Sequence, residues 1–111
     1  MRFVQVKRRE ILRVIGGQVP RDEAGNVVGK GDMRAQIEQV GKNAGACLKA
    51  AGATVNDIVS TISFVTAPAE LNKNADLLSR YFGPPTPETV PTARLSNPDF
   101  LLEVEGIAAI K

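Results

Sequence analysis

The chain has 111 residues, of which 43% are hydrophobic and only 5% aromatic, and its formal net charge is +2. This size and composition predict one globular domain over residues 1–111, and the nearly balanced charge argues against a nucleic-acid partner. No His is present, which excludes Ser-His and Cys-His catalytic pairs and most zinc and haem sites, so we expect neither a metal ion nor another cofactor.

The first part of the chain predicts a β-hairpin. Residues 3–7 and 11–16 are rich in Val and Ile, flank a charged break and lead to Gly16-Gly17, where we expect the second strand to end. The basic run Lys7-Arg8-Arg9 then belongs to a solvated turn, and the alternative is a weak patch for anions or RNA. Residues 20–31 contain many turn-forming residues and predict a polar loop.

A helix is predicted near residues 33–51. Asp32 is a suitable N-cap, and Gly52 lies where a glycine commonly ends a helix. The only cysteine, Cys47, excludes a disulfide within the chain and fits a reducing compartment; we expect it to be a buried thiol rather than a nucleophile. Small residues at Gly41 and Gly45 would let this helix approach a sheet closely. The expected buried positions are Met33, Ile37, Val40, Ala44, Cys47, Leu48 and Ala51.

The next two segments predict a strand and a second helix. Residues 58–66 form a β-branched run that alternates in side-chain direction, with Ile58 expected on the same side as Ser60, Ile62 and Phe64. A helix over about 69–82 would bury a stripe of Leu71, Ala75, Leu78 and Phe82.

The last third of the chain predicts extended structure. The proline-rich segment 84–87 is incompatible with a helix or a central strand, and residues 89–95 are extended, although Pro91 cannot donate a ladder bond. Residues 100–110 form the closing strand. On this strand Leu102 and Val104 point one way, while Glu103, Glu105 and Ile107 point the other.

These elements predict an α+β fold in which two helices cover one face of a single sheet. The other face would then need a cover, for which a partner subunit is the natural candidate. The N-terminus shows no long apolar stretch followed by a cleavage site, and the most apolar segment, 58–65, is too short to cross a bilayer. We therefore expect a soluble, cytoplasmic protein with no membrane contact.

Several segments together resemble the Rid (YjgF/RidA, L-PSP) family. They are residues 31–40 (Gly-Asp-Met-Arg-Ala-Gln-Ile-Glu-Gln-Val), 50–54 with 57–59, 80–83 (Arg-Tyr-Phe-Gly) and 101–108 (Leu-Leu-Glu-Val-Glu-Gly-Ile-Ala). The resemblance extends over essentially the whole chain and keeps the order of the elements.

The resemblance implies a chorismate-mutase-like fold with a mixed sheet, assembled as a homotrimer around a central barrel, with clefts between adjacent subunits. The best-known members hydrolyse enamines and imines, such as 2-aminoacrylate, to keto acids and ammonia without a metal or organic cofactor. An Arg holds the substrate carboxylate and a Glu orients the attacking water. An older label for the family is endoribonuclease or translation inhibitor.

The family site carries over onto this sequence only in part. The water-orienting Glu falls on Glu103, and the Ser-Gly-Gln segment becomes Gly16-Gly17-Gln18, which keeps the glycine backbone but loses the serine hydroxyl. The family's aromatic residue falls on Phe3, which lacks a hydroxyl. Pro87 stands where the carboxylate-binding Arg belongs, and Arg94, about seven residues later, is the nearest candidate replacement.

Three functions therefore stay open. The first is a Rid-family protein that binds a small metabolite, such as an imino or keto acid, in clefts between subunits. The second is an active enamine/imine deaminase with an altered substrate. The third is an RNA-directed or chaperone-like role, which only the basic run near the N-terminus supports and which lacks the interleaved aromatic residues of single-strand binders.

Overall fold

The computed structural model describes residues 11–83, 88–90 and 92–110. Its elements are, in chain order, β1 (Ile11–Gln18), α1 (Met33–Ala50), the short 3-10 helix η1 (Val55–Asp57), β2 (Ile58–Val65), α2 (Pro68–Lys73), α3 (Ala75–Phe82), β3 (Glu88–Thr89) and β4 (Leu102–Ile110).

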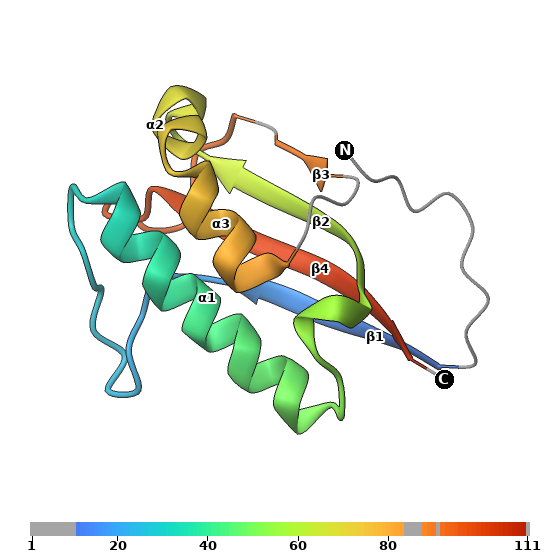
Figure 1. Cartoon of the computed structure of the whole chain (residues 1–111). Coiled ribbons are helices and arrows are strands. Elements are labelled where there is room, and N and C mark those ends of the chain that lie inside the picture. Colours follow the sequence, from blue (N-terminus) through green and yellow to red (C-terminus); the bar gives the residue numbers. More distant parts are fainter. Residues whose placement is uncertain (1–10, 84–87, 91, 111) are drawn as a thin grey trace.

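The strands form one mixed sheet in the order β1-β4-β2-β3. Strand β4 is antiparallel to both β1 and β2, whereas β3 is parallel to β2. Figure 1 shows α1 and α3 side by side across one face of this sheet, with no described element on the other face. The α+β fold with helices on one face is therefore confirmed. We call the face without helices the open face.

Strand β1 continues two residues further than predicted, through Gly16 and Gly17 to Gln18. Ile15 lies opposite Gly106 and Gln18 lies opposite Val104, so three steps on β1 match two steps on β4. This extra residue forms a β-bulge, so the strand continues through the glycine pair instead of ending there. The predicted first strand of the hairpin, residues 3–7, and the basic run of residues 7–9 lie outside the described residues.

Helix α1 begins and ends as predicted. The Asp32 carboxylate accepts a hydrogen bond from the Ala35 N–H at 3.1 Å, and Gly52 takes the left-handed conformation with φ of 74° just after the helix. The prediction of a buried thiol is wrong, because Cys47 is exposed. Leu48 occupies the position that faces the sheet, and Cys47 lies about 100° away around the helix, on its exposed flank.

The predicted second helix is in fact two helices, because the chain leaves the helical conformation at Asn74 (φ −113°, ψ 23°). The break shifts the phase of the second half, so that Leu77 is buried and Ala75 is exposed. Leu71 is buried as predicted, whereas Leu78 and Phe82 are only partly buried. The continuous stripe expected over 69–82 is therefore wrong after its first turn.

Gly41 allows α1 to pack closely against α3 rather than against the sheet. A Cβ atom at Gly41 would collide with the Tyr81 side chain, while one at Gly45 would meet nothing within 4 Å. The close approach to the sheet that we expected from these small residues is therefore a helix–helix contact at one glycine only.

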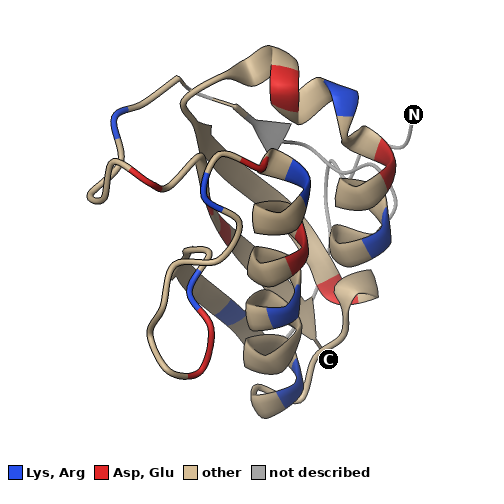
Figure 2. Ribbon diagram, turned by 90° about the vertical axis from the view of Figure 1, so that its left-hand side faces the viewer, with Lys and Arg blue, Asp and Glu red and all other residues tan. Residues whose placement is uncertain are grey.

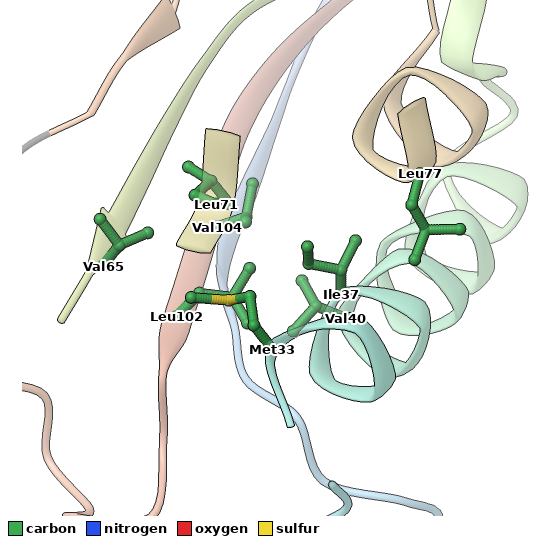
Figure 3. Packing of buried hydrophobic residues seen from close by; sticks show 8 residues of the cluster. All are labelled: Met33, Ile37, Val40, Val65, Leu71, Leu77, Leu102 and Val104. Carbon is green, nitrogen blue, oxygen red and sulfur yellow. The ribbon is translucent and has the colours of Figure 1, made fainter. Parts of the chain in front are cut away.

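The core lies between the helices and the sheet. Figure 3 shows side chains of α1, α2 and α3 facing those of β2 and β4. A second cluster includes Ile58, which packs with Leu48 on the helix side. The prediction had instead placed Ile58 on the side opposite Val65, which lies in the first core cluster. The register shift between Ile58 and Ser60 reverses the alternation at that point. The first cluster contains Met33, Ile37, Val40, Val65, Leu71, Leu77, Leu102 and Val104.

Only part of the predicted extended segment 89–95 follows the edge of the sheet. Thr89 pairs with Ile62, Thr92 forms a parallel bridge with Val65, and the Ala93 N–H donates to the Val65 carbonyl at 2.9 Å. Residues 84–87 and Pro91 lie outside the described residues.

The open face carries large apolar side chains. Within the single chain Leu12 is 63% exposed and Val14 is 79% exposed, and Ile107 of β4 lies opposite Val14. The helical side differs, because residues of both charge signs are interspersed along α1 and α3 (Figure 2). No helix among the described residues is long and apolar enough to span a bilayer.

Candidate functional site

Two of the residues predicted for the site, Gly17 and Glu103, are in contact on the open face. A Cβ atom placed on Gly17 would lie 2.8 Å from Cδ of Glu103 and 3.0 and 3.1 Å from its two carboxylate oxygens. The carboxylate therefore lies directly against the backbone of β1, in space that any other residue at position 17 would fill. We call this pair the Gly17–Glu103 site.

The alternation of β4 places Glu103 on the open face. Its neighbours Leu102 and Val104 are buried in the core, so the side chain between them points away from the helices. Glu103 pairs with Phe64 of β2 and is half-buried. Within the described part of the chain, its carboxylate forms no hydrogen bond or ion pair. A half-buried carboxylate of this kind is available to a ligand or to a water molecule.

The two neighbouring glycines have different surroundings. A Cβ atom on Gly16 would meet nothing within 4 Å, whereas the one on Gly17 would collide with Glu103. Neither glycine has a positive φ. The glycine at position 17 is therefore explained by the close approach of the carboxylate, and backbone strain does not explain either residue.

A shallow groove of about 150 Å³ lies next to this site on the open face. Glu105 contributes a second carboxylate to the same face as Glu103, two residues further along β4. The sequence correctly placed Glu105 on this face but did not reveal the groove. The alternating apolar residues of β1 were the sequence signal that could have indicated it. The side chains that line it include Val14, Ser60, Ile62, Glu105 and Ile107.

Arg94 is exposed and forms no ion pair with Glu103 within the described part of the chain. It follows Thr92, which bridges to Val65 at the end of β2, while Glu103 lies on β4 on the other side of β2. Two strand spacings, roughly 10 Å, therefore separate the two backbones across the sheet. The remaining predicted site residues, Phe3 and Pro87, lie outside the described residues.

The described residues contain no group of three or more His, Cys, Asp or Glu side chains that could hold a metal ion. Among the described residues, the titratable groups with a clearly shifted pKa, Arg34 and Asp76, belong to the helical layer instead. There a hydrogen bond from Arg34 lowers the pKa of the Asp76 carboxyl. The chemistry that the Gly17–Glu103 site offers is that of one free carboxylate beside exposed backbone and an apolar groove.

Known proteins resemble the chain over nearly its full length. The family model described as Endoribonuclease L-PSP matches residues 1–110. A RutC family protein of Pyrococcus abyssi is 37% identical over 97 residues, which cover 85% of this chain and 75% of that protein. A RutC family protein of Pyrococcus horikoshii is 34% identical over 96 residues, with the same coverage of 85% and 75%.

Solved structures give the same result. The Rid-family protein YyfB of Yersinia pestis, described as being of unknown function, superposes with a TM-score of 0.84 at 30% identity, covering 97% of this chain and 86% of that one. The YjgF protein of Escherichia coli gives a TM-score of 0.77 at 26% identity, covering 90% and 81%. The resemblance seen in the sequence is thus confirmed, and the chain belongs to the Endoribonuclease L-PSP family, also known as the Rid or YjgF family.

Proposed function

We propose that this protein binds a small metabolite in clefts between adjacent copies of the chain, with Glu103 and the backbone of Gly17 lining each cleft. The observation that carries the proposal is the carboxylate of Glu103, which lies on bare glycine backbone and has no partner among the described residues. Leaving a half-buried carboxylate unpaired is costly unless a ligand or water satisfies it.

The proposed assembly is a homotrimer, in which the open faces of three chains form a central barrel. Leu12 and Val14 support this arrangement, because side chains exposed by 63% and 79% on a regular strand would be covered by a neighbouring copy. The groove beside Glu105 would then become part of the space between subunits.

The ligand that fits best is a small molecule whose binding does not depend on a positively charged residue. Pro87 stands at the position where a carboxylate-binding Arg is expected, and Arg94 is exposed on the far side of β2. Losing one charge-paired contact costs about 2–5 kcal/mol for a carboxylate ligand. TdcF of Escherichia coli, which shares the fold at 23% identity, is described with bound serine, so a small polar metabolite is a suitable first probe.

A second candidate is hydrolysis of an enamine or imine, which the free carboxylate of Glu103 favours. The imine carbon is already electrophilic, so a carboxylate that accepts a proton from water would suffice to promote attack. Nitrogen would leave as ammonia and the carbon would become a carbonyl group. Glu103 is the one residue to which we assign a catalytic role in this reaction.

The first test is a thermal-shift screen against a set of small amino, imino and keto compounds. We expect a ligand-dependent rise in melting temperature, which Glu103→Gln abolishes because the amide replaces the anionic acceptor. A wild-type protein whose melting temperature none of the compounds changes would contradict the binding proposal.

The second test measures ammonia release from imines generated in the assay, both with and without a carboxylate group. Hydrolysis predicts a faster rise with wild-type protein and a return to the uncatalysed rate with Glu103→Ala. A progress curve that the wild type leaves unchanged would exclude the hydrolase candidate while leaving the binding proposal to the thermal-shift result.

A further inference from the structure

Two amide side chains of helix α1, those of Gln36 and Asn43, hold the chain on either side of the Gly17–Glu103 site. Val19, two residues after Gly17, and Leu101, two residues before Glu103, are each hydrogen-bonded by one of them. Since β1 and β4 are antiparallel, both held points lie at the same end of the sheet.

Gln36 is fully buried and uses its amide in three directions. Its Oε1 accepts from the Leu101 N–H at 2.7 Å, and its Nε2 donates to the carbonyls of Asp99 at 2.8 Å and Gly29 at 3.1 Å. Both N–H donors are therefore satisfied. The side chain fixes the backbone on both sides of Phe100 immediately before β4 begins.

Asn43 holds the other strand in the same way. Its Nδ2 donates to the carbonyls of Val19 at 3.0 Å and Arg21 at 2.9 Å, directly after the end of β1. Its Oδ1 accepts from Nε2 of Gln39 at 2.9 Å, which orients the amide with its donors toward the loop. Asn43 lies seven residues after Gln36, two turns along the same side of α1.

We propose that Gln36 and Asn43 are positioning residues that set Glu103 against Gly17. Two residues of strand span only about 7 Å, so a backbone held at Val19 and at Leu101 leaves little freedom for either site residue to slide. A slip of one residue would move the Glu103 side chain to the other face of the sheet. The β-bulge at Gly16-Gly17 interrupts the pairing of β1 with β4, so strand pairing holds Gly17 less tightly than Glu103, which also pairs with Phe64 of β2.

This inference rests on the proposed function only in treating the Gly17–Glu103 site as functional, and the contact itself can be measured without a ligand. The readout is the nuclear Overhauser effect between Hα of Gly17 and Hγ of Glu103 in selectively labelled protein, with Glu103→Gln used to assign the signals. The variants are Gln36→Met and Asn43→Leu, which remove the hydrogen bonds while keeping a side chain of similar size.

Asn74→Ala is the matched control. The Asn74 amide also donates to a backbone carbonyl, that of Glu70 at 2.7 Å, but it lies in the helical layer between α2 and α3. All three variants should lower the melting temperature. Only Gln36→Met and Asn43→Leu should lose the Gly17–Glu103 signal.

If Gln36→Met does not fold, Gln36→Glu replaces it, because it retains an acceptor for the Leu101 N–H and removes the two Nε2 donor bonds; it should also weaken the signal. Folded Gln36 and Asn43 variants with an undiminished signal, or equal loss in Asn74→Ala, would overturn the proposal.

If wild type hydrolyses an imine, kcat should fall about 10- to 100-fold in both variants with little change in KM. If wild type shows neither ligand response nor hydrolysis, the proposed function fails while loss of the signal still supports the positioning role.

Discussion

At the scale of single residues, the site depends on the lack of a side chain at Gly17. Gly17 leaves the space that the Glu103 carboxylate occupies, and no backbone strain requires glycine there. A carboxylate that lies over bare backbone can face a ligand and the strand at once. The glycine therefore sets the position of the acid rather than the conformation of the chain.

Replacing Gly17 should separate the position of Glu103 from stability. Gly17→Ala puts a methyl group 2.8 Å from Cδ of Glu103, and because the flexible side chain can swing away we expect a loss of about 1 kcal/mol or less in the free energy of unfolding. The ligand-dependent rise in melting temperature should disappear. Gly45→Ala is the control, since its methyl group also meets nothing within 4 Å and it lies on α1, away from the open face; a ligand response of Gly17→Ala equal to that of Gly45→Ala would contradict this account.

Much of the site could be read from the sequence, but its contacts could not. Alternation along 100–110 correctly placed Glu103 on the face opposite Leu102 and Val104. The contact with Gly17 depends on a bulge that adds one residue to β1, and strand patterns do not reveal bulges. Gln36 falls beside the apolar stripe of α1, and nothing in the helical period shows that a buried amide there would bind Leu101.

At the scale of elements, helices α1 and α3 contact each other at Gly41, which packs against Tyr81, and through the ion pair between Arg34 and Asp76. Sequence periodicity found α1, with both of its ends, because one continuous stripe covers a long helix. It failed for the second helix, because Asn74 interrupts the hydrogen bonding and resets the phase. Cys47 was misplaced for a related reason: periodicity does not show where neighbouring elements stop covering the flank of a helix.

The two glycines of α1 should respond to alanine in opposite directions. Gly41→Ala forces a methyl group into the Tyr81 side chain. Overpacking of this kind should lower the free energy of unfolding by about 1–3 kcal/mol, and the better helix propensity of alanine should offset part of that loss. Gly45→Ala has free space and should add about 0.5–1 kcal/mol to the free energy of unfolding. Urea denaturation of both variants checks this pair, and a stabilised Gly41→Ala would show that α3 is packed more loosely than described.

The ion pair between Arg34 of α1 and Asp76 of α3 predicts that the free energy of unfolding depends on pH. Arg34 binds Asp76 with an N–O distance of 3.0 Å, and its hydrogen bond lowers the pKa of the Asp76 carboxyl below the ordinary value. Because folding lowers this pKa, its contribution is present above the ordinary pKa of about 4 and is lost as the pH falls through the lowered value.

The variant Asp76→Asn should therefore differ from wild type near neutral pH and converge with it in strong acid. Both residues are exposed, so the difference should be small and should shrink further in high salt. Melting curves recorded between about pH 2 and 7 test this. A gap between the two proteins that widens as the pH falls would contradict the assigned sign.

At the scale of the whole molecule, the sheet has one face covered by helices and one face that carries exposed Leu12 and Val14. Composition and element order predicted this asymmetry, because two helices cover only one side of a single sheet. The sequence did not show which residues line the groove beside Glu105, since that depends on how β1, β4 and β2 are aligned. We expect other copies of the chain to cover the open face.

A charge on the open face should prevent this assembly. Val14→Asp places a carboxylate at a position that is 79% exposed in the single chain, so the folded chain should tolerate it, whereas an interface between copies should not. Sedimentation should then detect single chains. The control Lys42→Glu changes the charge on the exposed side of α1 and should leave the assembly intact.

The mass of the native wild-type protein at low micromolar concentration tests the account most directly, because every cleft we propose requires neighbouring copies. We predict a species of three times the 11.8 kDa chain mass, with up to one ligand for each chain once a binding compound is known. Folded single chains as the dominant species at that concentration would contradict the account, because Glu103 would then face open solvent with no cleft around it.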